Sequence, residues 1–176
     1  MRAFIEQDPD GNGQADTIGM VVLSDVYGEY PNNTFAIDNI FTAFDAYPNV
    51  WIEKDGKAVY GSVQEEMKEP LQLLHRWYTE GLIDKEFATR TNDDIVGLIS
   101  TGKCGIFIGP WWSPFNQAQT STYTSGDAEW DNVSCPVPSD GMINANSPKS
   151  SGGFVGVRAG YAPPELALKL VHVSSA

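Results

Sequence analysis

Oxygen-bearing side chains recur at alternate positions in one short segment near the start of the chain, DPDGNGQAD at residues 8–16. In the calcium loop of an EF-hand, side-chain oxygens at positions 1, 3, 5 and 9 converge on the ion, position 6 is glycine, and position 7 supplies its carbonyl. The same spacing here predicts a calcium site formed by Asp8, Asp10, Asn12, Asp16 and the backbone carbonyl of Gln14.

The match to an EF-hand ends before the last ligand. Position 12, which carries a bidentate Glu in an EF-hand, is Gly19 in this sequence. Because calcium takes about 6 to 8 oxygen ligands, another residue or water must complete the shell. The alternative is a solvated turn that binds no ion. Where Ca²⁺ binds, we expect it to be structural rather than catalytic.

A pair of adjacent tryptophans forms the second candidate site. The residues Gly109, Pro110, Trp111 and Trp112 directly follow an apolar run at residues 104–108. A tryptophan held on a turn at the end of a strand suits stacking on the apolar face of a sugar ring. The alternative is that both rings pack in the core. We take the four residues as the candidate ligand-binding set.

No arrangement of residues typical of catalysis occurs in the sequence. The two histidines, His75 and His172, have no nucleophile at a recognisable spacing, and there is no nucleophile elbow, zinc-protease motif or phosphate-binding loop. Neighbouring acids such as Glu65 and Glu66 point in different directions on a helix. Nothing favours a pair of glycosidase carboxylates. We therefore expect no enzymatic activity from these residues.

The charge balance narrows the class of partner. The 176 residues carry 11 basic and 23 acidic side chains, a formal net charge of −12. Nucleic acid and anionic membrane surfaces are disfavoured, because affinity for phosphate depends on Lys and Arg. The longest apolar run is too short to span a bilayer, and the first residues do not read as a signal peptide. Cys104 and Cys135 form either one disulfide or two buried free thiols in strands.

Short apolar runs alternate with helical patterns along the chain. Strands are expected at residues 18–23, 104–108, 133–137 and 154–157, with a hairpin at 51–60 around Asp55 and Gly56. Helices are expected at residues 2–7, 34–46, 62–80 and 92–102 and from Pro163 onward, whereas residues 113–132 read as mostly loop. The alternation predicts an α/β fold, with a mixed sheet flanked by helices.

Three details of these elements follow from particular residues. Asn33 is the expected N-cap of the second helix. Pro70 predicts a kink in the long helix or a later start. The buried stripe of that helix is expected to contain Val63, Met67, Leu71, Leu74 and Tyr78. Both ends of the chain read as interrupted, so we expect one domain over residues 1–176, taken from a longer protein.

Several segments together resemble one family. They are WYTEGLID at residues 77–84, STGK at 100–103, CGIFI at 104–108, GPWW at 109–112, VP at 137–138, GGFVGV at 152–157 and PELALKL at 164–170. In this order they resemble the family 1 extracellular solute-binding proteins of bacterial ABC importers. The loop at residues 8–16 and the Asp55-Gly56 hairpin look most like the oligosaccharide-binding lipoprotein branch of Gram-positive bacteria.

The resemblance implies a function without chemistry. It implies one lobe of a type II periplasmic-binding-protein fold, most of the second lobe, which captures an oligosaccharide or another neutral small solute for an ABC transporter permease. It also implies a lipid-anchored, extracellular parent protein, a structural calcium in the loop, and a sugar stacked on Trp111. Members of the branch commonly have an acid after the position of Asp16, where this chain has Thr17.

Two other classes of protein are the alternatives. One is a free-standing calcium-dependent carbohydrate-binding module, and the other is a fragment of a secreted glycoside hydrolase. The helical stripes argue against the first, which would be mostly β. For an isolated lobe, exposed apolar surface favours self-association.

Overall fold

The computed structural model describes residues 1–27, 34–125, 128–135, 156–160, 165 and 169. The chain divides into two compact units, Met1–Asn146 and Ser147–Ala176, which are described separately. In the second unit, residues 156–160 form no helix or strand, and Glu165 and Lys169 are helical. The expected final helix otherwise lies outside the described residues, so a single domain over the whole chain stays a prediction.

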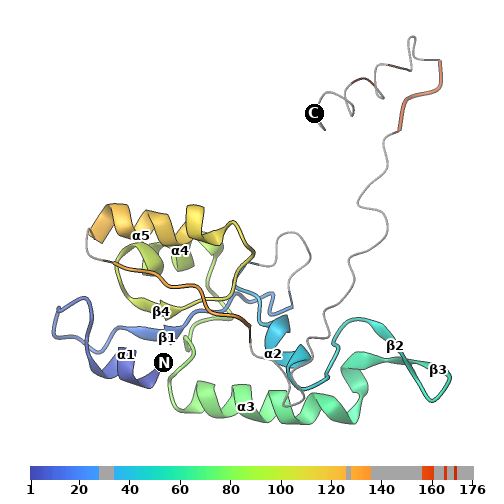
Figure 1. Cartoon of the computed structure of the whole chain (residues 1–176), viewed down its shortest axis with the longest axis horizontal. Coiled ribbons are helices and arrows are strands. Elements are labelled where there is room, and N and C mark those ends of the chain that lie inside the picture. Colours follow the sequence, from blue (N-terminus) through green and yellow to red (C-terminus); the bar gives the residue numbers. More distant parts are fainter. Residues whose placement is uncertain (28–33, 126–127, 136–155, 161–164, 166–168, 170–176) are drawn as a thin grey trace. The chain divides into compact units, whose positions relative to one another are not determined.

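The first unit is an α/β structure built on two small sheets (Figure 1). Strand β1 (Ile18–Met20) pairs in parallel with β4 (Cys104–Ile106), and Met20 also forms a parallel bridge with Ile83. Strands β2 (Trp51–Lys54) and β3 (Lys57–Tyr60) form the predicted antiparallel hairpin. The α/β class is therefore confirmed. Among the described residues, however, the parallel pair and the antiparallel pair form two separate sheets and not the single mixed sheet that the sequence predicts.

The helices of the first unit are α1 (Arg2–Glu6), α2 (Asp38–Thr42), α3 (Lys68–Thr79), α4 (Asn92–Ser100) and α5 (Gln117–Ser125), with single 3₁₀ turns at Gly61–Val63, Glu65–Met67 and Ser113–Phe115. Helix α3 takes the later start, so that Pro70 falls in its first turn, where a missing N–H costs little. Gly81, at φ 72°, ends it in the left-handed conformation typical of a helix stop. No helix in the described part of the chain is long and apolar enough to cross a membrane.

Helices cover both faces of the parallel strand pair. Met20 and Val22 pack into one apolar cluster with Ile40, Phe41 and other residues of the α2 and α3 side. Val21 points the other way, into a second cluster of Phe35, Ile95, Ile99 and Cys104. This alternation places α3 on one side of β1 and α4 on the other, as Figure 1 shows.

The apolar stripe predicted for α3 is only partly correct. Met67 is buried and Leu74 packs against the core, but Val63 is 76% exposed and Leu71 is 47% exposed. The helix starts after Val63, so that side chain precedes the helical periodicity. Tyr78 is 39% exposed and instead makes an edge-to-face contact with Phe87.

The helix predicted at residues 34–46 is much shorter in the structure. Phe35 has a φ of 67°, which no α-helix allows, and its N–H donates to the carbonyl of Ile108 at 2.7 Å. Its side chain is fully buried. Packing against the end of β4 therefore overrides the local helical pattern, and α2 begins only at Asp38. The expected cap, Asn33, lies outside the described residues.

The loop predicted at residues 113–132 contains a helix, so that prediction is wrong. Helix α5 packs against α4 and buries Ala118. Hydroxyl groups of its sequence donate to carbonyls one turn earlier, such as Thr120 Oγ1 to the Asn116 carbonyl at 2.8 Å. The helix is stabilised by its neighbour, and composition alone does not reveal that contact.

The strand predicted at residues 133–137 is absent where it is described. Residues 133–135 have no regular structure and Val133 is 83% exposed, while residues 136–137 lie outside the described part. The strand predicted at 154–157 is likewise not formed at its described end, residues 156–157. Both cysteines are free thiols: Cys104 is buried in β4, where burial raises its pKa to about 12, and Cys135 is exposed.

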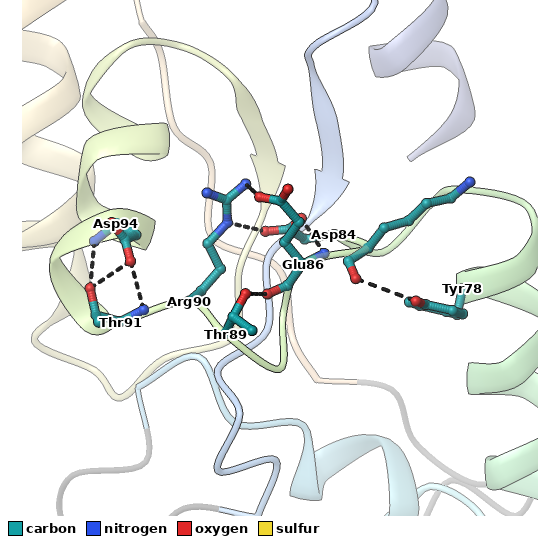
Figure 2. A network of polar contacts seen from close by, with 8 residues as sticks. Tyr78, Asp84, Glu86, Thr89, Arg90, Thr91 and Asp94 are labelled. Carbon is teal, nitrogen blue, oxygen red and sulfur yellow. Dashed lines mark hydrogen bonds and ion pairs between the residues drawn. The ribbon is translucent and has the colours of Figure 1, made fainter.

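A partly buried ion pair fixes the connection between α3 and α4 (Figure 2). The Asp84 side chain is 5% exposed, and its Oδ2 accepts a bond from Arg90 Nε at 2.8 Å. Its Oδ1 accepts the N–H of Glu86 at 3.0 Å, while its backbone N–H donates to the Met20 carbonyl at 3.2 Å. The paired carboxylate raises the pKa of the Arg90 guanidinium. Asp84 therefore links β1 to the segment that leads into α4.

Candidate functional site

A cavity of about 620 Å³ lies at the carboxyl end of β4. The strand and its continuation supply one wall, including Gly109, Pro110 and Trp111. Trp77 of α3 and the segment of residues 130–135 also line the cavity. In open α/β sheets, ligands bind beyond the carboxyl ends of parallel strands, so this is the expected place for a ligand.

The two predicted tryptophans lie differently at this cavity. Trp111 lines it and is 79% exposed, whereas Trp112 is half-buried and does not line it. Their rings meet edge to face, with centroids 5.6 Å apart. Trp112 therefore packs against Trp111, and the exposed ring of Trp111 is available for stacking on an apolar ligand face.

The turn that carries Trp111 is close-packed. The N–H of Ser113 donates to the Pro110 carbonyl at 2.9 Å. A Cβ at Gly109 would lie 2.3 Å from the Ser113 hydroxyl oxygen, so the turn has no room for a side chain there. Gly109 and Pro110 therefore fix the position of Trp111, as expected for a turn restricted by proline.

Three further residues at the cavity were missed by the sequence analysis. Ser113 lines it, and its buried hydroxyl oxygen has no hydrogen-bond partner among the described residues. Trp77 and Trp130 add two more aromatic rings to the wall. Trp77 belongs to the segment at residues 77–84 that resembles the solute-binding family. Sequence spacing alone does not show that its ring lines a cavity, because that depends on how α3 packs in the fold.

The loop of residues 8–16 brings its predicted calcium ligands into one hydrogen-bonded turn. Asn12 Nδ2 donates to Asp10 Oδ2 at 2.7 Å and to Asp16 Oδ1 at 3.2 Å. Asp8 Oδ2 accepts the N–H of Gly13 at 2.8 Å, and Asn12 Oδ1 accepts the N–H of Gln14 at 2.7 Å. The amide of Asn12 thus occupies the centre of the turn.

The carboxylates of the loop differ in their surroundings. Asp8 Oδ1 and Asp10 Oδ1 are buried and have no hydrogen-bond partner in the described part of the chain. Desolvation, and then the neighbouring Asp8, raise the pKa of Asp10. The pKa of Asp16 is lowered, chiefly by its contact with the Lys103 ammonium. The unpartnered oxygens are chemically suited to a hard cation such as calcium.

The loop is not a closed metal site as it stands. In the ranges that the structure describes, no three His, Cys, Asp or Glu side chains are gathered so that they could hold an ion by themselves. Asn12 and a backbone carbonyl would have to contribute, and the Asn12 amide would have to present its oxygen instead of its nitrogen. The donor set therefore fits calcium in its chemistry and requires a local rearrangement to bind it.

The structure explains why the last EF-hand position is glycine. Gly19 lies in β1, and a Cβ there would stand 2.7 Å from the Leu82 carbonyl oxygen. A glutamate at this position is therefore excluded, because β1 packs too closely against the backbone of Leu82. Thr17 is 7% exposed and its hydroxyl donates to the Ile5 carbonyl at 3.4 Å, so it faces α1. Any remaining ligand must come from elsewhere.

Comparison with known proteins identifies the class to which this structure is related. No family model matches the chain. It is 35% identical over 112 residues to the lipoprotein LipO of Bacillus subtilis strain 168, covering 61% of this chain and 21% of LipO. It is 28% identical over 109 residues to the polygalacturonan/rhamnogalacturonan-binding protein YtcQ of the same strain, covering 61% of this chain and 20% of YtcQ.

Solved structures give the same class. An extracellular solute-binding protein from Bifidobacterium longum subsp. infantis is 27% identical, with a TM-score of 0.50 over 68% of this chain and 26% of that one. The fold is also shared with the S. pneumoniae ABC-transporter substrate-binding protein FusA, solved with kestose, at 24% identity and a TM-score of 0.51 over 68% of this chain and 23% of FusA. The resemblance to extracellular solute-binding proteins is confirmed, and the chain spans about a fifth of the curated relatives' length.

Proposed function

We propose that this chain is part of the second lobe of a family 1 extracellular solute-binding protein that captures oligosaccharides for an ABC importer. The observation that carries the proposal is the exposed Trp111 ring among the residues that line the cavity beyond β4. An aromatic ring beside an apolar cavity with a few polar groups is the usual design of a sugar site. The lipid-anchored extracellular location, the permease partner and self-association of the chain belong to the same proposal.

Capture without chemistry is favoured over hydrolysis by the residues of the cavity. A glycosidase places two carboxyl groups on opposite sides of the bond that it cleaves. Among the described residues that line this cavity, Asp131 is the only acid. The relatives named above are likewise binding proteins and a lipoprotein. A single acid supports hydrogen bonding to sugar hydroxyls and gives no acid-base pair.

Two classes of oligosaccharide are the first ligands to test. YtcQ is named for binding polygalacturonan and rhamnogalacturonan, which are acidic, and FusA was solved with kestose, which is neutral. The net charge of −12 of this chain opposes an acidic ligand unless a cation intervenes. We therefore propose a neutral oligosaccharide as the ligand.

Replacing Trp111 by alanine should remove most of the sugar binding. One lobe offers part of a site that closes around its ligand, so we expect a dissociation constant near millimolar for this chain, about 4 kcal/mol of binding free energy. Saturation-transfer NMR detects binding in this range. With fructo-oligosaccharides, Trp111→Ala should weaken binding about tenfold or more, because a stacking ring often dominates such a site.

Trp51 provides a matched control for this experiment. It is 71% exposed but lies on the β2–β3 hairpin, in the other sheet, so Trp51→Ala removes an exposed ring without touching the cavity. We expect Trp51→Ala to bind the sugar with wild-type affinity. We expect Trp111→Ala to keep the wild-type melting temperature. Equal loss in both variants, or none in either, would place the sugar site elsewhere.

We also propose that the loop of residues 8–16 binds a structural calcium ion through Asp8, Asp10, Asn12, Asp16 and the Gln14 carbonyl. An ion that binds only the folded chain raises stability by RT ln(1 + [L]/Kd), about 2.7 kcal/mol at a hundredfold excess over Kd. The melting temperature should therefore be several degrees higher in millimolar calcium than in chelator. Magnesium at the same concentration is the control, since its smaller octahedral shell suits this loop poorly. Identical melting curves in calcium and chelator would refute the site.

A further inference from the structure

Lys103 places a cation against the loop of residues 8–16 from a distant part of the sequence. Its ammonium group forms an ion pair with Oδ2 of Asp16, 87 positions away. The lysine backbone is fixed, because its carbonyl accepts the Ile18 N–H at 2.7 Å beside the β1–β4 pair. The two side chains are only 30% and 33% exposed. The contact is therefore held in place by the core of the unit, unlike a pair between two free surface side chains.

The position of Lys103 matters because Asp16 is the loop's ninth residue. Both oxygens of Asp16 also accept from Asn12 Nδ2, at 3.2 and 3.3 Å. Asp16 is thus fully supplied with donors, whereas Asp8 Oδ1 and Asp10 Oδ1 have none among the described residues. The Lys103 ammonium group therefore contacts the loop at the carboxylate of Asp16, which is also one of the proposed calcium ligands.

We propose that Lys103 is a built-in competitor of calcium for Asp16. Its ammonium group balances the charge of Asp16 and holds the end of the loop to the start of β4. A divalent cation within a few ångströms of an ammonium is repelled, so Lys103 must turn away or the ion binds with a weakened hold on Asp16. Lys103 therefore lowers the affinity of the loop for calcium. It also stabilises the folded loop when a chelator has removed calcium. This inference rests on the calcium site proposed above.

The test compares Lys103→Met with the wild-type chain in two measurements. Calorimetric titration with calcium chloride should give a dissociation constant about tenfold lower for Lys103→Met, since one repelling charge is gone. The melting temperature in chelator should fall, because Asp16 loses its counter-charge. The rise in melting temperature on adding calcium should accordingly be larger in the variant than in the wild type.

Two controls separate this effect from a general change in charge. Lys57→Met removes the same charge from an exposed position on the β2–β3 hairpin and should leave calcium affinity unchanged. Lys103→Arg keeps the cation and should keep the wild-type dissociation constant within about twofold. Equal or weaker calcium binding by Lys103→Met overturns the inference while the site itself stands. Absence of calcium binding in every variant overturns the site and the inference together.

Discussion

Replacing Arg90 by methionine should lower the free energy of unfolding by about 3 kcal/mol, because it leaves the buried carboxylate of Asp84 without its counter-charge. Asp84 is 5% exposed, and Arg90 Nε is 2.8 Å from its Oδ2. Methionine retains much of the arginine's apolar contact, so the loss reports the charge rather than a cavity. Urea denaturation followed by circular dichroism measures it.

Two further variants show whether the loss comes from the unpaired carboxylate. The double variant Asp84→Asn with Arg90→Met should be more stable than Arg90→Met alone, since asparagine keeps an acceptor for the Glu86 N–H without a charge. Lys68→Met breaks the exposed ion pair with Glu65 and should leave the urea midpoint almost unchanged. A loss of less than 1 kcal/mol in Arg90→Met would mean that solvent already screens Asp84.

Replacing Gly61 by alanine should destabilise the protein by about 3 kcal/mol, the upper end of the usual cost of overpacking. A Cβ at this position would stand 1.8 Å from the backbone carbonyl oxygen of Tyr47, which cannot move without displacing the chain. The Gly61 N–H donates to the Val50 carbonyl at 2.8 Å, so the two segments are already bonded. The same denaturation experiment measures the change.

Gly97 gives the matched control for that substitution. It lies inside α4, and a Cβ there would have no atom within 4 Å. Gly97→Ala should therefore raise stability by about 1 kcal/mol, the difference in helix propensity between the two residues. If Gly61→Ala were as harmless as Gly97→Ala, the close approach at Tyr47 would have to relax at little cost.

The elements that the sequence analysis placed correctly are those with strong local signals. Asp55 and Gly56, both with positive φ, supply the turn of the hairpin, and Gly81 ends α3. The acidic start expected for α4 is present, with Thr91 and Asp94 forming a reciprocal cap that Figure 2 shows. In each case the deciding interaction joins residues only a few positions apart.

The elements placed wrongly depend on distant partners. Phe35 leaves the helical conformation to bond with Ile108, and α5 forms because it lies against α4. The two candidate sites follow the same division between local and distant interactions. Trp111 and the loop at residues 8–16 could be selected from residue type and spacing alone. Ser113 and Lys103 could not, since their roles arise from contacts that only the folded chain brings together.

The pairing of β1 with β4 has a consequence for the order in which the chain acquires its structure. The hairpin of β2 and β3 closes a short turn and can form within microseconds, whereas the contact between Asp16 and Lys103 closes a loop of 87 positions. Closing that loop costs chain entropy before any core contact rewards it. We therefore expect the β1–β4 pair to form later than the hairpin, and a nascent chain released before Lys103 emerges has only the bridge at Ile83 to hold its first strand.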